Sequence, residues 1–165
     1  MRPSDLDHLD PDAARAVVTA WAAVPRWVDA VLAGRPYASV EDLRDRAAAL
    51  AAGWTDEEVA GALAHHPRIG ERPAGDDAAA RASRHEQSAS AATTDADTAR
   101  ALRDGNAAYE ERFDRVFLVR AAGRSAADVL SELHRRLGND DAAEAAEVAE
   151  QLREIALLRL ERTFA

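Results

Sequence analysis

The stretch that decides the fold is residues 139–165, NDDAAEAAEVAEQLREIALLRLERTFA. Its large apolar residues recur at helical spacing and form one face: Val148, Leu152, Ile155, Leu158 and Leu160. Alanine and charged residues occupy most of the remaining positions. The pattern predicts a long amphipathic helix that buries one face against the rest of the chain, with Asn139 as its N-cap.

Helix start and stop signals recur through the rest of the chain. They predict helices from Asp10-Pro11 to about Ala23, Pro25 to Gly34, Ser39 to just before Gly53, Thr55 to about His65, Asp76 to Ala91, Asp95 to Arg112, and Ser125 to Gly138. Residues 68–77 contain two glycines and a proline, which predicts a loop. Residues 116–122 (VFLVRAA) are apolar and fit either an extended segment or a buried helical turn. We therefore predict an all-α fold of about eight helices in one compact domain over residues 1–165.

The charge balance disfavours two classes of partner. The chain has 21 basic and 30 acidic residues and a net charge of -9, so nucleic acid and anionic membrane surfaces would be repelled. Residues 1–12 lack the apolar run of a signal peptide, and no stretch approaches the 18 apolar residues of a membrane span. We expect a cytoplasmic protein, and the sequence leaves its oligomeric state open, including a homodimer.

Two residue types are absent from the sequence, and their absence limits the chemistry. Without Cys the chain has no disulfide, thiolate nucleophile or Cys-ligated metal, and without Lys it cannot form a Schiff base with a substrate or with pyridoxal phosphate. The five histidines are not arranged at metal-ligand spacing. We therefore expect no metal and no organic cofactor.

Two short stretches contain residues suited to catalysis. In residues 65–72 (HHPRIGER), His66 lies beside a rigid proline and could act as a general acid or base. The alternative is that the same residues only end a helix and form a Pro-Gly turn. In residues 83–87 (SRHEQ), Ser83, Glu86 and Gln87 share one helix face, and the alternative is a solvated polar surface. Spacing alone does not choose between these explanations.

Taken together, the motifs resemble the family of 2-oxo-4-hydroxy-4-carboxy-5-ureidoimidazoline (OHCU) decarboxylases. The resemblance rests on four pieces along nearly the whole chain: His66-Pro67-Arg68-Ile69-Gly70, Ser83-x-x-Glu86-Gln87, Asn106-x-x-Tyr109-x-x-x-Phe113, and the segment from Glu147-Val148 to Arg159-Leu160. It implies an all-helical, cofactor-independent carboxy-lyase that converts OHCU to (S)-allantoin and carbon dioxide in urate degradation. A related ureido or imidazoline substrate, and a non-catalytic helical binding module, are the alternatives.

The resemblance also implies roles for particular residues. His66 and Glu86 correspond to the catalytic groups, and Pro67 lies beside the histidine in the pocket. The groups that correspond to substrate contacts are Ser83, Gln87, Arg159 and the backbone of Val116, Phe117, Leu118 and Val119. For Arg159 the alternative is an exposed cation on the last helix. The chain departs from the family pattern at Asp114, where many relatives have Gly, and at residues 88–90 (SAS), where Ala-Gly is common.

The substrate chemistry agrees with the residues available. OHCU carries its carboxylate and a hydroxyl on one ring carbon beside a C=N bond, so the electrons released with carbon dioxide flow into that bond. A histidine, a carboxylate and an arginine then suffice to orient the substrate and move its protons.

Overall fold

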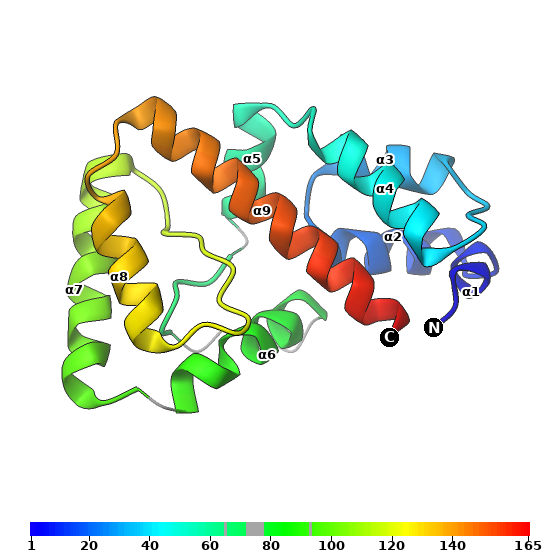
Figure 1. Cartoon of the computed structure of the whole chain (residues 1–165). Coiled ribbons are helices and arrows are strands. Elements are labelled where there is room, and N and C mark those ends of the chain that lie inside the picture. The colour runs from blue at the N-terminus through cyan, green and yellow to red at the C-terminus, as the bar shows by residue number, and fades with distance from the viewer. Residues whose placement is uncertain (65, 72–77, 93) are drawn as a thin grey trace. The chain divides into compact units, whose positions relative to one another are not determined.

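The computed structural model describes residues 1–64, 66–71, 78–92 and 94–165, without the side chains of residues 89–92. These residues form nine helices and no strand, which confirms the all-α prediction (Figure 1). The helices are α1 (Pro3–Asp7), α2 (Pro11–Trp21), α3 (Pro25–Ala33), α4 (Val40–Ala51), α5 (Asp56–Leu63), α6 (Ala78–Ala92), α7 (Ala96–Phe113), α8 (Ala126–Arg136) and α9 (Asp141–Phe164). The five-residue α1 is additional to the predicted set.

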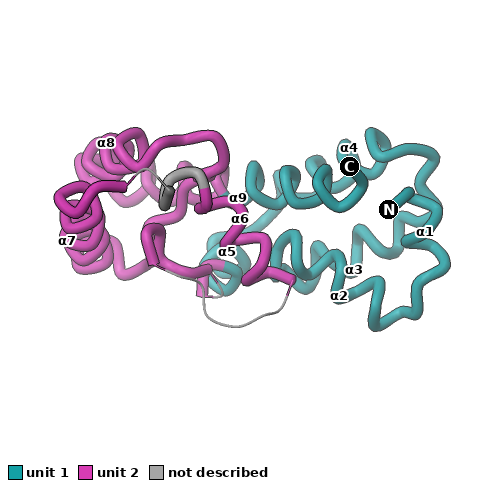
Figure 2. Tube along the Cα trace, turned by 90° about the horizontal axis from the view of Figure 1, so that it is seen from below, with its two compact units in different colours: residues 1–62, 152–165 teal, residues 63–151 magenta. Residues whose placement is uncertain are grey.

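The chain divides into two compact units, coloured separately in Figure 2. Unit 1 comprises residues 1–62 and 152–165, so it contains α1 to α4, most of α5 and the second half of α9. In it α3 packs against both α2 and α4. Tryptophans tie these elements together, since Trp27 Nε1 donates to Ala47 O (2.9 Å) and Trp21 Nε1 donates to Thr163 Oγ1 (2.8 Å). The expectation of one domain over residues 1–165 stays a prediction.

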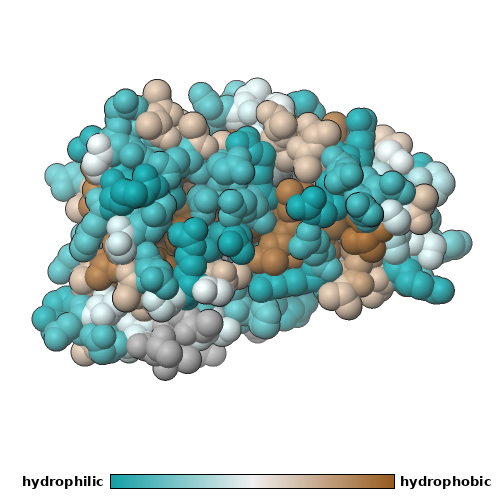
Figure 3. Space-filling model, viewed as in Figure 1, coloured by the Kyte–Doolittle hydropathy of each residue, from teal (hydrophilic) through white to brown (hydrophobic). Residues whose placement is uncertain are grey.

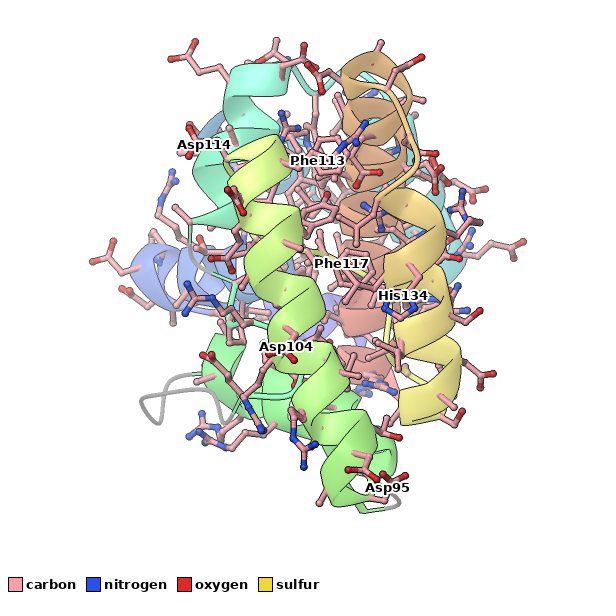
Figure 4. All side chains as sticks on the ribbon, turned by 90° about the vertical axis from the view of Figure 1, so that its left-hand side faces the viewer. Asp95, Asp104, Phe113, Asp114, Phe117 and His134 are labelled. Carbon is pink, nitrogen blue, oxygen red and sulfur yellow. The ribbon has the colours of Figure 1, made fainter. Side chains whose placement is uncertain are left out.

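Unit 2 comprises residues 63–151 and is built around α7 and α8, which pack side by side and run in the same direction. Its core is a cluster of buried residues: Ile69, Leu102, Tyr109, Phe113, Phe117, Val119, Ala121, Ala126, Val129 and Leu133. Figure 4 shows Phe113 and Phe117 between the two helices. The helices approach closely at Gly105, where a Cβ atom would lie 2.5 Å from Leu133 Cδ2, so any larger residue there would force the Leu133 side chain to move.

The predicted helix starts rest on local hydrogen bonds that the structure contains. Asp10 caps α2, Ser39 caps α4 and Ser125 caps α8, each by accepting from a backbone N–H two or three residues ahead. The expected cap of the last helix is wrong, because Asp140 rather than Asn139 accepts from Ala143 N–H (2.8 Å). The Asn139 side chain donates instead to the carboxylates of Glu144 and Glu147.

Residues 116–121, which the sequence leaves open between an extended segment and a buried helical turn, form no helical turn and pair with no strand. Residues 116–121 lack regular secondary structure, yet Phe117, Leu118, Val119 and Ala121 are buried. The start of the predicted 68–77 loop is confirmed by the turn at residues 69–70, whereas residues 72–77 lie outside the described part, as does His65. The face in Figure 3 is mostly hydrophilic, with hydrophobic residues visible between polar ones. Across the residues that the structure places, no helix combines the length and hydropathy that crossing a bilayer requires.

Candidate active site

The segment that carries His66 begins at the end of α5 and turns sharply. His66 N–H donates to Leu63 O (2.9 Å), and both His66 and Pro67 are half-buried. A turn follows in which Glu71 N–H donates to Arg68 O (3.2 Å). Its third residue, Gly70, has a φ of +84°, a conformation that side chains disfavour. The glycine of the motif is therefore required by the turn that follows the histidine.

Two side chains from other helices hold this turn in place. Gln87 Oε1, on α6, accepts from Gly70 N–H (3.0 Å), and Asn106 Nδ2, on α7, donates to Ile69 O (2.9 Å). The Ile69 side chain is itself buried in the core of unit 2. The backbone of the turn that follows His66 is thus bonded to side chains of both neighbouring helices. Asn106 Oδ1 is buried and has no hydrogen-bond partner among the described residues.

On α6, the polar residues of the motif face inward. Ser83 is 5% exposed and Glu86 is 8% exposed, and Gln87 is half-buried, whereas His85 on the same helix is exposed. Ser83 and Glu86 also interact with other groups of the protein. A solvated polar surface is therefore the wrong explanation for this stretch. The structure places a hydroxyl and a carboxylate, both largely withdrawn from water, on the helix that also bonds the His66 turn.

The backbone of residues 116–120 is held from the interior of unit 2. Arg136 Nη1 donates to Leu118 O (2.7 Å), and Arg120 N–H donates to Gln151 Oε1 (2.9 Å). The peptide groups of Phe117 and Val119 have no hydrogen bond to the described residues. The side-chain bonds that hold this segment therefore run through the peptide groups of Leu118 and Arg120.

Arg159 is a buried residue of unit 1, so its interpretation as an exposed cation is wrong. Its exposed fraction is 6%, and its Nη1 donates to Ala20 O (3.2 Å). All other candidate residues belong to unit 2: His66, Pro67, Ser83, Glu86, Gln87, Val116, Phe117, Leu118 and Val119.

Arg68, the arginine of the His66 motif, already pairs with an acidic residue. Arg68 forms a two-pronged ion pair with Glu110, with Nε–Oε1 and Nη2–Oε2 distances of 2.5 and 2.7 Å. The Arg68 guanidinium lowers the pKa of the Glu110 carboxyl. A substrate carboxylate would have to displace Glu110, so Arg68 is a poor substitute for Arg159. No group of three His, Asp or Glu side chains suited to a metal ion occurs among the described residues, and the absence of a metal stays a prediction.

A protein-family model described as OHCU decarboxylase matches residues 7–161. The chain belongs to the OHCU decarboxylase family. Members of this family are carboxy-lyases. A 2-oxo-4-hydroxy-4-carboxy-5-ureidoimidazoline decarboxylase of Amia calva is 32% identical over 133 residues, which are 80% of this chain and 76% of that protein. The uric acid degradation bifunctional protein TTL of Arabidopsis thaliana is 33% identical over 105 residues, or 62% of this chain, and the match spans only 32% of that longer relative.

Two solved structures share the fold of this OHCU decarboxylase family member. A crystal structure of OHCU decarboxylase in the presence of (S)-allantoin has a TM-score of 0.75 at 23% identity, covering 87% of this chain and 94% of that one. A crystal structure of (S)-allantoin synthase has a TM-score of 0.70 at 15% identity, covering 98% of this chain and 54% of that one. At these identities the likeness establishes the fold.

Several buried polar residues of unit 2 have no role assigned to them by the sequence motifs of this OHCU decarboxylase family member. Arg136 and Glu144 are fully buried, and Tyr109 is buried against them. Asn106 and Tyr109 stand in the family motif, which singles them out without assigning a function. Arg136 follows Arg135 at the end of a helix, where cations usually interact with the helix dipole in solvent. No local pattern distinguishes the buried arginine from its exposed neighbour.

Proposed function

We propose that this chain decarboxylates OHCU to (S)-allantoin and carbon dioxide, with His66 and Glu86 as its catalytic groups. Family membership supports the reaction class. The observation that carries the assignment to this site is the Gly70–Gln87 hydrogen bond. It joins the turn that follows His66 to the helix that presents Ser83 and Glu86.

The reaction needs no external electron acceptor. The bond between the ring carbon and the carboxylate breaks, and its electron pair moves into the ring, while the C=N pair passes to the nitrogen, which takes up a proton. The hydroxyl then loses its proton as it becomes a carbonyl, and the neighbouring ring carbon gains one. His66 is the principal acid/base group, and Glu86 bonds the hydroxyl and relays the proton to one face of the ring.

The remaining candidate residues bind the substrate. Ser83 and Gln87 offer a hydroxyl and an amide beside Glu86, and the unbonded peptide groups of Phe117 and Val119 offer donors and acceptors to the ring. In a chain of net charge -9, a guanidinium is needed to hold a carboxylate, and we assign this contact to Arg159 by the family resemblance. The proposal includes turnover without metal or cofactor, in the cytoplasm.

The decisive experiment follows circular dichroism while urate oxidase and hydroxyisourate hydrolase generate the substrate from urate, with and without this protein. OHCU decays slowly by itself to racemic allantoin, so catalysis appears as a faster, stereospecific signal of (S)-allantoin. His66→Ala should lower the rate on the order of 10²–10⁴-fold, and His85→Ala, an exposed histidine on α6, should leave it unchanged. Racemic product formed at the uncatalysed rate by the wild type would refute the proposal.

Metal dependence is tested on the same protein. Activity should survive chelator treatment, with no stoichiometric metal by elemental analysis. Activity that is lost on chelation and restored by a metal would contradict the cofactor-independent mechanism.

A further inference from the structure

A fully buried ion pair lies in unit 2, and the resemblance assigns no role to either of its residues. Arg136 on α8 and Glu144 on α9 both have a side-chain exposure of 0%, and Arg136 Nε lies 3.0 Å from Glu144 Oε1. Tyr109 donates to the same carboxylate, and Asn139 Nδ2 donates to Glu144 Oε2 at 2.9 Å. The carboxylate is therefore fully hydrogen-bonded.

The arginine of this pair also contacts residues 117–118 directly. Its Nη1 donates to Leu118 O (2.7 Å), and its guanidinium carbon lies 4.8 Å from the centroid of the Phe117 ring. The Phe117 ring meets Tyr109 edge-on, with a centroid separation of 5.2 Å. One guanidinium thus fixes both a carbonyl and a side chain of the irregular segment that lacks helix or strand bonds of its own.

Stability alone is a weak reason for such a pair. Removing two charges from water costs several kcal/mol per ion, and apolar residues of similar volume are often as stable or more so. What an apolar pair lacks is a planar group of fixed geometry that bonds a carboxylate on one edge and a peptide carbonyl on another. An arginine suits this position because its guanidinium can orient the Leu118 peptide while it pairs with Glu144.

We propose that Arg136 is a positioning residue that sets the backbone of residues 116–119 against the substrate ring, through the Leu118 carbonyl and the Phe117 ring. This inference rests on the proposed function, which assigns that backbone to the substrate. With the Leu118 carbonyl turned towards Arg136, the neighbouring peptide groups of Phe117 and Val119 are the ones left for a ligand. A displacement of about 1 Å in such groups costs on the order of 10²-fold in rate.

The first test compares adjacent arginines of α8. Arg136→Lys keeps the positive charge beside Glu144, but a single ammonium cannot replace the fork that reaches Leu118, so kcat/KM should fall on the order of 10²-fold with a lower excess of (S)-allantoin. Arg135→Lys is the matched control, because Arg135 is exposed and pairs with Glu132 and Glu147 at the surface. A folded Arg136→Lys protein with wild-type kcat/KM and enantiomeric excess would overturn the inference.

A double variant separates positioning from stability. Arg136→Met with Glu144→Met removes both charges, which usually preserves folding, but it also removes the bond to Leu118. A positioning role predicts that kcat/KM stays reduced and KM raised when the variant is assayed well below its own melting temperature, where it is fully folded. Recovery of activity together with stability would show a purely structural role. Failure of the proposed function is distinguishable, because it would appear in the wild type as absent turnover before any variant is compared.

Discussion

Glu86 is a largely buried carboxylate, and its role in catalysis can be tested by removing its charge. It is 8% exposed and lies one helical turn from Ser83, which is 5% exposed. Glu86→Gln keeps the shape of the side chain and removes its ionisation, so the rate of carbon dioxide release should fall on the order of 10²-fold or more while allantoin still binds. Stopped-flow decarboxylation and calorimetric allantoin binding measure the two effects.

The control for Glu86 is an exposed carboxylate of the same unit. Glu111→Gln on α7 should leave both rate and binding unchanged. Wild-type rate and full (S) excess in Glu86→Gln would show that Glu86 neither relays the proton nor orders the intermediate.

Arg159 tests the assignment of substrate-carboxylate binding. Arg159→Gln removes the guanidinium fork, and we expect KM to rise on the order of 10-fold or more, since charge-assisted bonds contribute roughly 1.5–3 kcal/mol. Arg162→Gln, an exposed arginine of the same helix, is the control. Unchanged KM and kcat in Arg159→Gln would exclude Arg159 as the anion contact.

At the level of elements, the start of α5 carries a pH-sensitive contribution to stability. Glu58 accepts from Arg26 Nε (2.7 Å), from Arg26 Nη2 (2.8 Å) and from Thr55 N–H (2.9 Å). The bonds from Arg26, and then that from Thr55, lower the pKa of Glu58 from 4.5 to about 2. Because the folded-state pKa lies below the unfolded one, this stabilisation is complete above about pH 5 and is lost as the pH falls towards 2.

Glu58→Gln should therefore reduce the free energy of unfolding at pH 7 by about 1 kcal/mol, and by much less at pH 3. Urea unfolding at the two pH values measures the difference. Glu57 is an exposed neighbour in the same helical turn. Glu57→Gln should change the free energy of unfolding by similar small amounts at both pH values. Equal losses for Glu58→Gln at both pH values would contradict the assignment.

The C-terminal end of α7 contains a strained residue whose cost in stability can be measured. Asp114 caps it with a φ of 51° and a ψ of 37°, and its N–H donates to Glu110 O. This left-handed conformation explains why glycine suits the position, and a negative charge at a helix C-terminus adds to the cost. Asp114→Gly should raise the free energy of unfolding by about 0.5–1 kcal/mol, and Asp114→Ala should lower it. Thermal melts of Gly, Ala and Asn variants give the ranking, and a more stable Ala variant would contradict the strain argument.

The elements predicted correctly are those specified by neighbouring residues. The side chains of Asp10, Ser39 and Ser125 bond backbone N–H groups two or three positions away. The residue types and their spacing were therefore sufficient to predict these helix starts. Asn139 shows the limit, because its side chain is drawn to the buried Glu144, a contact set by packing. In the candidate site, the motifs were visible in sequence, but the burial of Glu86 and the role of Arg136 depend on tertiary neighbours.

At the scale of the whole molecule, α9 belongs to both compact units. Residues 141–151 of the helix lie in unit 2 and residues 152–164 in unit 1, and one run of helical backbone joins them. Each unit has fewer than 100 residues, a size at which burial of apolar surface leaves only a small margin of stability. Unfolding either unit would remove the packing that supports its half of the shared helix.

We therefore expect the two units to unfold together, with one calorimetric transition whose van't Hoff and calorimetric enthalpies agree. Glu150→Pro breaks the helical backbone next to the boundary and should both destabilise the chain, by about 3 kcal/mol, and separate the transition into two. Glu150→Ala changes the same exposed side chain and leaves the helix intact, so its transition should stay single. Two transitions in the wild type would mean that the units fold independently, and that the shared helix does not couple them.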